Sequence, residues 1–226
     1  MAEDTRLPLV RPVPKGGDWR GNALIGGSWE NEMMLAPGFL DAGNILVEYW
    51  KAHRPDDTLA LPILYNLRHG IELALKIAIR DAAACARRDG IVDAKWERDE
   101  LDQRLGRTHK IGSLAEELNE CLALLKGIAG TDNGQLDVDT KEVLDSLHNL
   151  DESGQAFRYS VVKTGSGKHR KLAPARPDVQ YVDLEHIAGV LYEVGVLVFG
   201  GVCSVLEQYR DRQQANRDAQ FGPAGA

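Results

Sequence analysis

One short stretch of the sequence, LRHGIELALK at residues 67–76, carries the clearest candidate chemistry in the chain. Arg68, Glu72 and Lys76 recur every four residues, so on a helix they form a ladder of alternating charge along one side. His69 lies three residues before Glu72 and falls on the same side. Two interpretations remain open: a solvated salt-bridge ladder, or a polar site on a rigid central helix.

A second candidate is a basic segment, residues 153–177, which contains no Asp or Glu. The chain as a whole has a net charge of −7, so this local excess of positive charge favours a phosphate-contacting surface. The alternative is a solubilising hairpin that pairs with acidic residues elsewhere, such as those at 97–102. Its cationic side chains are Arg158, Lys163, Lys168, Arg170, Lys171 and Arg176, together with His169.

His109 is a third candidate, because it lies at the start of a predicted helix that begins around Thr108 or Ser113. The positive end of the helix dipole would favour a neutral imidazole there. The alternative is a local capping or packing role. The chain has no GxSxG, no HExxH and no His/Cys cluster with metal-ligand spacing, so we expect neither a hydrolase triad nor a metal or other cofactor.

The element that must position these residues is a long helix over residues 59–88. Its apolar side chains cover an arc of roughly 200°, wider than a surface helix needs, which predicts a central helix with several neighbours. The remaining pattern predicts an all-α fold, a helical bundle of about five helices with a small β-hairpin before the last helix. We expect an extended arm at 1–37, a helical domain at 38–212, a hairpin at about 156–173, and a disordered tail at 213–226. The predicted helices lie near 39–53, 59–88, 108–127, 137–153 and 183–213, and the fourth begins after either Asp137 or Asp139.

Local signals mark several of these boundaries. Asp89-Gly90 ends the central helix, and Asp183 caps the last one. The highly charged residues 91–107 predict an exposed segment. In the last helix, glycines lower helix stability, so we expect them to serve close helix approach; they are Gly189, Gly195, Gly200 and Gly201.

Composition is that of a soluble globular protein, with 43% hydrophobic and 27% charged residues. The acidic balance argues against a protein that coats nucleic acid generally. Three widely spaced cysteines, Cys85, Cys121 and Cys203, predict buried thiols in a reducing, cytoplasmic setting. The apolar run at 187–206 is interrupted by Glu193, which favours a core helix over a membrane span, and its all-round apolar character predicts a homodimer that buries it.

Three segments together resemble bacterial HEPN-superfamily proteins. LPILYNLRHGIELALK resembles their "RH..EL.LK" helix through Arg68, His69, Glu72, Leu73, Leu75 and Lys76. THKIGSLAEEL resembles their "HDL..L" helix start at His109, Ile111 and Leu114, with Lys110 in place of the usual acid. FRYS resembles their "RYP" element at Phe157, Arg158 and Tyr159, with Ser160 in place of proline. The resemblance covers roughly residues 38–212.

The resemblance implies an α-bundle that often dimerises, and a metal-independent endoribonuclease or RNA-binding protein of a bacterial toxin–antitoxin, phage-defence or stress system. It further implies His69 or His109 as acid/base, Arg68 as a catalytic phosphate binder, and Glu72 as the orienting group. Supporting RNA or phosphate contacts would come from Arg158, Tyr159, Lys76, Lys168, Arg170 and Lys171. Arg104 to His109 satisfies the R-x4-6-H spacing of catalytic members, but Leu105 follows the arginine where a polar residue is usual. Non-catalytic members make the alternative a helical interaction module that regulates a cognate partner protein.

Overall fold

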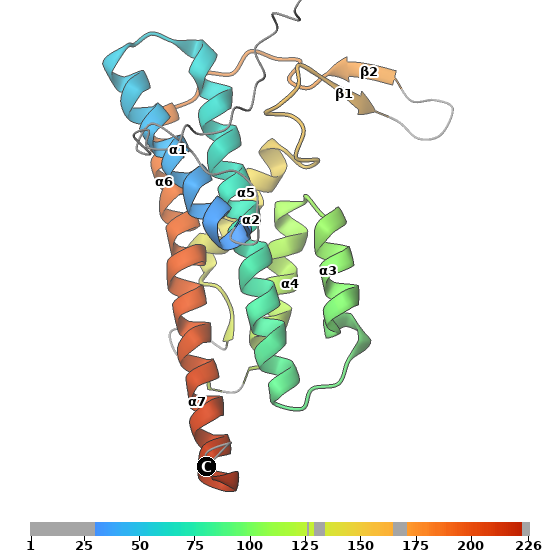
Figure 1. Cartoon of the computed structure of the whole chain (residues 1–226). Helices are drawn as coiled ribbons and strands as arrows, with labels where there is room; N and C mark the ends of the chain where they lie inside the picture. The colour runs from blue at the N-terminus through green and yellow to red at the C-terminus, as the bar shows by residue number, and fades with distance from the viewer. Residues whose placement is uncertain (1–29, 126, 129–133, 165–170, 223–226) are drawn as a thin grey trace, which may run out of the picture. The chain divides into compact units, whose positions relative to one another are not determined.

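A computed structural model of the chain describes residues 30–125, 127–128, 134–164 and 171–222. The chain divides by its contacts into residues 1–31 and residues 32–226. The second unit is an all-α bundle with one two-stranded hairpin before the last helix, which confirms the predicted fold class (Figure 1). Most of the predicted arm lies outside the described residues, but helix α1 (Glu32–Ala52) begins earlier than predicted and takes Pro37 into its second turn.

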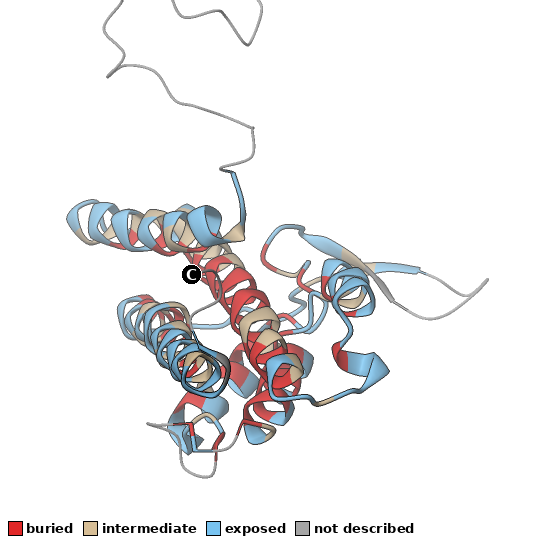
Figure 2. Cartoon of the chain, turned by 60° about the horizontal axis from the view of Figure 1, so that its bottom comes forward, coloured by how far each residue is buried: buried red, intermediate tan, exposed pale blue. Residues whose placement is uncertain are grey.

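Helix α2 (Ala60–Arg88) is the central element, as its wide apolar arc predicts. It is buried along most of its length (Figure 2). It packs against α1 and against three later helices, α4 (Ile111–Ala123), α6 (Leu184–Val196) and α7 (Cys203–Phe221). Its C-terminus falls where the glycine signal indicates, because Gly90 adopts a φ of +83° that most side chains avoid. The polar residues Arg68, Glu72 and Lys76 therefore lie on a helix that packs against neighbouring helices on several sides.

The charged stretch after α2 is not the fully exposed segment that its composition predicts. It contains helix α3 (Arg98–Arg107), whose Leu101 and Leu105 are buried beside the core. Helix α4 then begins at a backbone without a side-chain cap, so neither Thr108 nor Ser113 caps it. The Thr108 hydroxyl instead donates to the Arg104 carbonyl and closes α3. His109 thus lies in the turn between α3 and α4, just before the first residue of α4, which has no side-chain cap.

Helix α5 (Val138–Leu150) begins after Asp137, the first of the two predicted starts, and the Asp137 carboxylate accepts from the Thr140 amide at 2.9 Å. Leu144 and Leu147 are buried as expected, whereas Leu150 is exposed. Strands β1 (Val161–Thr164) and β2 (Lys171–Pro174) then pair antiparallel, which confirms a hairpin shorter than the predicted 156–173. Figure 1 shows it extending from the end of the helices at which α4 begins.

The last helix is longer than predicted. Helices α6 and α7 join through a π-helical segment, Leu197–Val202, and Asp183 caps the start by accepting from the His186 amide. The predicted disordered tail is wrong up to Phe221, because no glycine or proline interrupts α7 before Gly222.

The joined helix has one face that the unit does not cover. Over Leu184–Gln220 it is long and apolar enough, by length and composition alone, to cross a membrane, and 28% of its most apolar 18-residue window is buried. Core helices of soluble proteins pass the same test. Val196 and Leu197 are exposed on this face, so it is available to a further apolar surface.

Candidate functional site

The charged ladder of α2 is buried, not solvated. Arg68, Glu72 and Lys76 are 2%, 2% and 5% exposed. Glu72 accepts from both cations: Arg68 Nη1 lies 3.0 Å from its Oε2, and Lys76 Nζ lies 2.9 Å from its Oε1. A buried charge must be paired to be tolerated, so these three residues form one interdependent unit.

Arg68 ties this unit to two other segments at the same end of the bundle. Its Nη2 donates to the His109 carbonyl at 2.5 Å, and its Nε lies 3.2 Å from Asp151 Oδ2. Asp151 is 1% exposed and follows the last residue of α5. Its other oxygen accepts from the Ala156 amide at 2.8 Å, so this carboxylate also fixes the loop that leads to the hairpin. Arg68 therefore joins α2, the α3–α4 turn and the end of α5.

His109 completes a dyad with Glu72. Its Nδ1 lies 2.9 Å from Glu72 Oε1, while the side chain is 52% exposed. Burial works to raise the pKa of Glu72, but Lys76, His109 and Arg68 outweigh it and hold that pKa at about 2. An ionised carboxylate only accepts hydrogen bonds, so it selects the tautomer with hydrogen on Nδ1 and leaves the Nε2 lone pair of the neutral ring for another proton.

Gly154 allows the loop to approach this dyad closely. It has a φ of +73°, and a Cβ at this position would lie 2.9 Å from Arg68 Nη2 and 3.2 Å from His109 Cβ. Its carbonyl accepts from Arg158 Nε at 3.0 Å and from Nη2 at 2.8 Å. Only a glycine suits this conformation and this space, and its carbonyl places an exposed arginine beside the buried ladder.

His69 takes part in a different arrangement, a row of flat side chains. Its ring meets Phe39 edge-on with centroids 4.4 Å apart and stacks with Tyr65 at 5.8 Å. The Arg158 guanidinium lies 5.7 Å from the centroids of both Tyr65 and Tyr159. Burial, opposed by Glu72 and reinforced by the neighbouring cations, lowers the pKa of His69, which favours its neutral form.

The structure brings most of the predicted site residues together. Arg68, His109 and Arg158 lie around Gly154, and Glu72 bonds to both Arg68 and His109. His69 and Tyr159 lie along the adjoining row. Arg68 and Lys76 are buried, so neither presents a donor to a large ligand. Lys171 is exposed on β2, whereas Lys168 and Arg170 lie outside the described residues.

Sequence reasoning missed two members of the site, Asp151 and Gly154. The sequence marks Gly154 as a helix terminator, which is true of many glycines, and Asp151 as one more acid near a helix end. No metal-binding group of His, Cys, Asp or Glu occurs among the residues that the structure describes. Cys121 is buried, which raises its pKa to about 12, so it is no candidate nucleophile.

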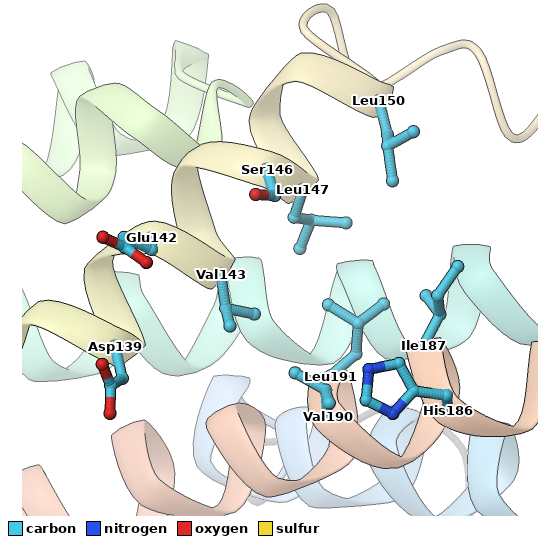
Figure 3. Close-up of a pocket in the computed structure, with 10 residues that line it drawn as sticks. All are labelled: Asp139, Glu142, Val143, Ser146, Leu147, Leu150, His186, Ile187, Val190 and Leu191. Atoms are coloured by element: carbon cyan, nitrogen blue, oxygen red, sulfur yellow. The ribbon is translucent and has the colours of Figure 1, made fainter. Parts of the chain in front are cut away.

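The hollows of the surface lie apart from the dyad. One, of about 520 Å³, separates α5 from α6 and is lined mostly by apolar side chains, with Asp139, Glu142 and His186 among them (Figure 3). Another, of about 540 Å³, lies between the start of α2 and the segment 175–182. Neither lining includes a ladder residue or His109; in the dyad Glu72 is buried and His109 is half exposed.

No protein-family model, curated protein or solved structure matches the chain. Its function has to be inferred from the arrangement of its own residues.

Proposed function

We propose that this chain is a HEPN-like, metal-independent endoribonuclease whose general base is His109. The observation that carries the proposal is the Nδ1 contact of His109 with Glu72, 2.9 Å from a buried carboxylate whose pKa is held at about 2. That contact fixes the ring and its tautomer, while half of the side chain stays open to solvent. A base fixed in this way by a second group is a recurring device of acid–base catalysis.

The reaction follows from the position of the free nitrogen. His109 Nε2 takes the proton from an RNA 2′-OH, and the resulting oxygen attacks the adjacent phosphorus. The bond from phosphorus to the 5′ oxygen breaks, leaving a 2′,3′-cyclic phosphate, and an acid returns a proton to the leaving oxygen. His69 is the second histidine at this end of α2 and the candidate for that acid. Its lowered pKa favours the neutral ring, so it can donate that proton only in the fraction of molecules in which it is protonated.

The cations of the site have different roles because some are buried and one is exposed. Arg68 and Lys76 are enclosed and paired, so they act as positioning residues that keep Glu72 ionised. Arg158 is exposed and uses only Nε and Nη2 on Gly154 among the described residues. Its remaining Nη1 suits contact with a phosphate oxygen, where the charge of the transition state develops. Residues 163–171 of the hairpin add cations that would guide the polyanion by counterion release.

An RNA-cleavage assay in excess chelator tests the proposal. We expect wild type to cleave and His109→Ala to lose roughly 100-fold or more in rate. Glu72→Gln should also lose activity through the orientation of His109, and its rate is compared under conditions in which circular dichroism shows the variant folded. His53→Ala is the matched control, because that histidine is exposed and its described interactions are with Tyr49, through the backbone carbonyl and the stacked ring. Equal rates for wild type and His109→Ala would overturn the assignment.

We further propose that the chain acts in the bacterial cytoplasm, in a toxin–antitoxin, defence or stress system, as a homodimer. Two neighbouring elements expose apolar side chains: α1 exposes Ile45 and Tyr49, and the last helix exposes Val196 and Leu197. A second copy of the chain that packs against them would bury these side chains. Light scattering at micromolar concentration should give twice the chain mass. A monomer that binds phospholipid vesicles would instead assign the face to lipid.

A specific observation also favours a second function, a non-catalytic module that regulates a partner protein. The ladder is fully neutralised inside the chain, which a structural network requires and a catalytic one does not. The apolar hollow between α5 and α6 (Figure 3) has the character of a groove for a helix or strand. RNA that stays intact with all variants would leave this function standing.

A further inference from the structure

A row of flat side chains adjoins the dyad. Five groups follow one another: Phe39 on α1, His69 and Tyr65 on α2, then Arg158 and Tyr159 from the loop before β1. The His69 and Tyr65 rings are nearly parallel, at 7°. The last member, Tyr159, is 53% exposed, so the row ends at solvent with an aromatic face available.

Aromatic rings and arginine planes in such an order suit the faces of nucleobases. Every base has a flat π surface, and stacking on an aromatic side chain is the usual way in which proteins hold unpaired bases. Arg158 adds a cation between two tyrosines, which strengthens stacking and also attracts the phosphate joined to the base. A base paired in a duplex hides its faces from a side chain, so this surface selects single strands.

We infer that Tyr159 and Arg158 form a nucleobase-stacking subsite for single-stranded RNA. The inference rests on the proposed function for its ligand and names the substrate class. The subsite adjoins the dyad through one residue, since Arg158 bonds to the Gly154 carbonyl and a Cβ at Gly154 would touch His109. With a base stacked on Tyr159, the adjacent Arg158 can contact its phosphate, and the contacts through Gly154 lead from Arg158 to His109.

The binding test uses a labelled single-stranded oligoribonucleotide with 2′-O-methyl riboses, which lacks the attacking hydroxyl. We expect Tyr159→Leu to weaken binding by roughly tenfold, whereas Tyr159→Phe keeps the ring and the affinity. Inorganic polyphosphate, which has charge but no bases, should bind wild type and both variants equally. Tyr159 is exposed, so the variants should keep their thermal unfolding midpoints, which excludes a loss through misfolding.

Each outcome decides something. Equal oligonucleotide affinity for wild type and Tyr159→Leu overturns the subsite, as does an equal loss of polyphosphate binding. Binding that depends on Tyr159 in a protein that cleaves no unmodified RNA supports the subsite and refutes catalysis. Cleavage that depends on His109, with binding that does not change in Tyr159→Leu, supports catalysis and refutes the subsite. A wild type that binds no single-stranded RNA overturns both.

Discussion

Replacing Glu72 with glutamine should cost more stability than any change on the surface, and by an amount that depends on pH. The pKa of this carboxyl falls from 4.5 to about 2 on folding, a difference of about 2.5, and each pKa unit corresponds to about 1.36 kcal/mol. The ionised form therefore contributes on the order of 3 kcal/mol. That is a large share of a typical free energy of unfolding of about 5–15 kcal/mol.

The sign follows from the lowered pKa. Glu72 is ionised in both states above about pH 4.5, where its full contribution is present, and the contribution is lost as the pH falls toward the folded pKa of about 2. Glu72→Gln also leaves Arg68 and Lys76 without their shared anion at every pH, and turns an amide donor toward one of them. We expect a loss of about 3–5 kcal/mol at neutral pH that shrinks as the pH falls from about 4.5 toward about 2.5.

Urea denaturation followed by circular dichroism at several pH values measures this difference directly. Glu48→Gln is the control, because Glu48 pairs with Lys51 at 2.9 Å on the exposed surface, where such a pair contributes less than about 1 kcal/mol. A loss at neutral pH no larger than that of the control, or one that stays constant down to about pH 2.5, would refute the account of the buried ladder.

Three further predictions concern other surfaces. Gly195→Ala should destabilise the chain by about 1–3 kcal/mol, because its Cβ would lie 2.5 Å from Leu40 Cδ2. Gly189→Ala has no described heavy atom within 4 Å of its Cβ, so it should stabilise the chain by up to about 1 kcal/mol. Thermal unfolding compares the two variants. Gly154→Ala should lower both stability, by more than about 1 kcal/mol, and RNA cleavage, and normal cleavage in this variant would contradict the role of the close approach. Removing three hairpin cations should weaken RNA binding at low salt and flatten its salt dependence, measured by titration, and an unchanged affinity would remove the hairpin from the interface. The variant for that test is K168A/R170A/K171A.

The helices were predictable where one periodicity dominates the sequence. The arc of α2, its end at Gly90 and the caps at Asp137 and Asp183 follow from local rules, and the structure confirms them. Helix α3 was not predicted because only Leu101 and Leu105 are apolar among its ten residues, and their burial depends on neighbours that no local window contains. Of the four glycines expected to serve close packing in the last helix, only Gly195 meets another helix among the described residues, since that depends on which face turns inward.

The candidate site shows the same division between local and distant information. The ladder can be predicted from the spacing within one helix. Its burial and the contact of Glu72 with His109 could not be predicted in this way, because His109 is 37 residues away and the position of the α3–α4 turn has to be known. Asp151 was harder still, because an acid after a helix normally faces water. It is buried because Arg68 and Lys76 bring two positive charges against the single negative charge of Glu72, and a buried network of that kind needs a second anion. Charge balance around a predicted buried ladder is therefore a usable signal: once Arg68, Glu72 and Lys76 are taken as buried, a fourth, acidic residue has to come from another segment, and Asp151 is where this fold supplies it.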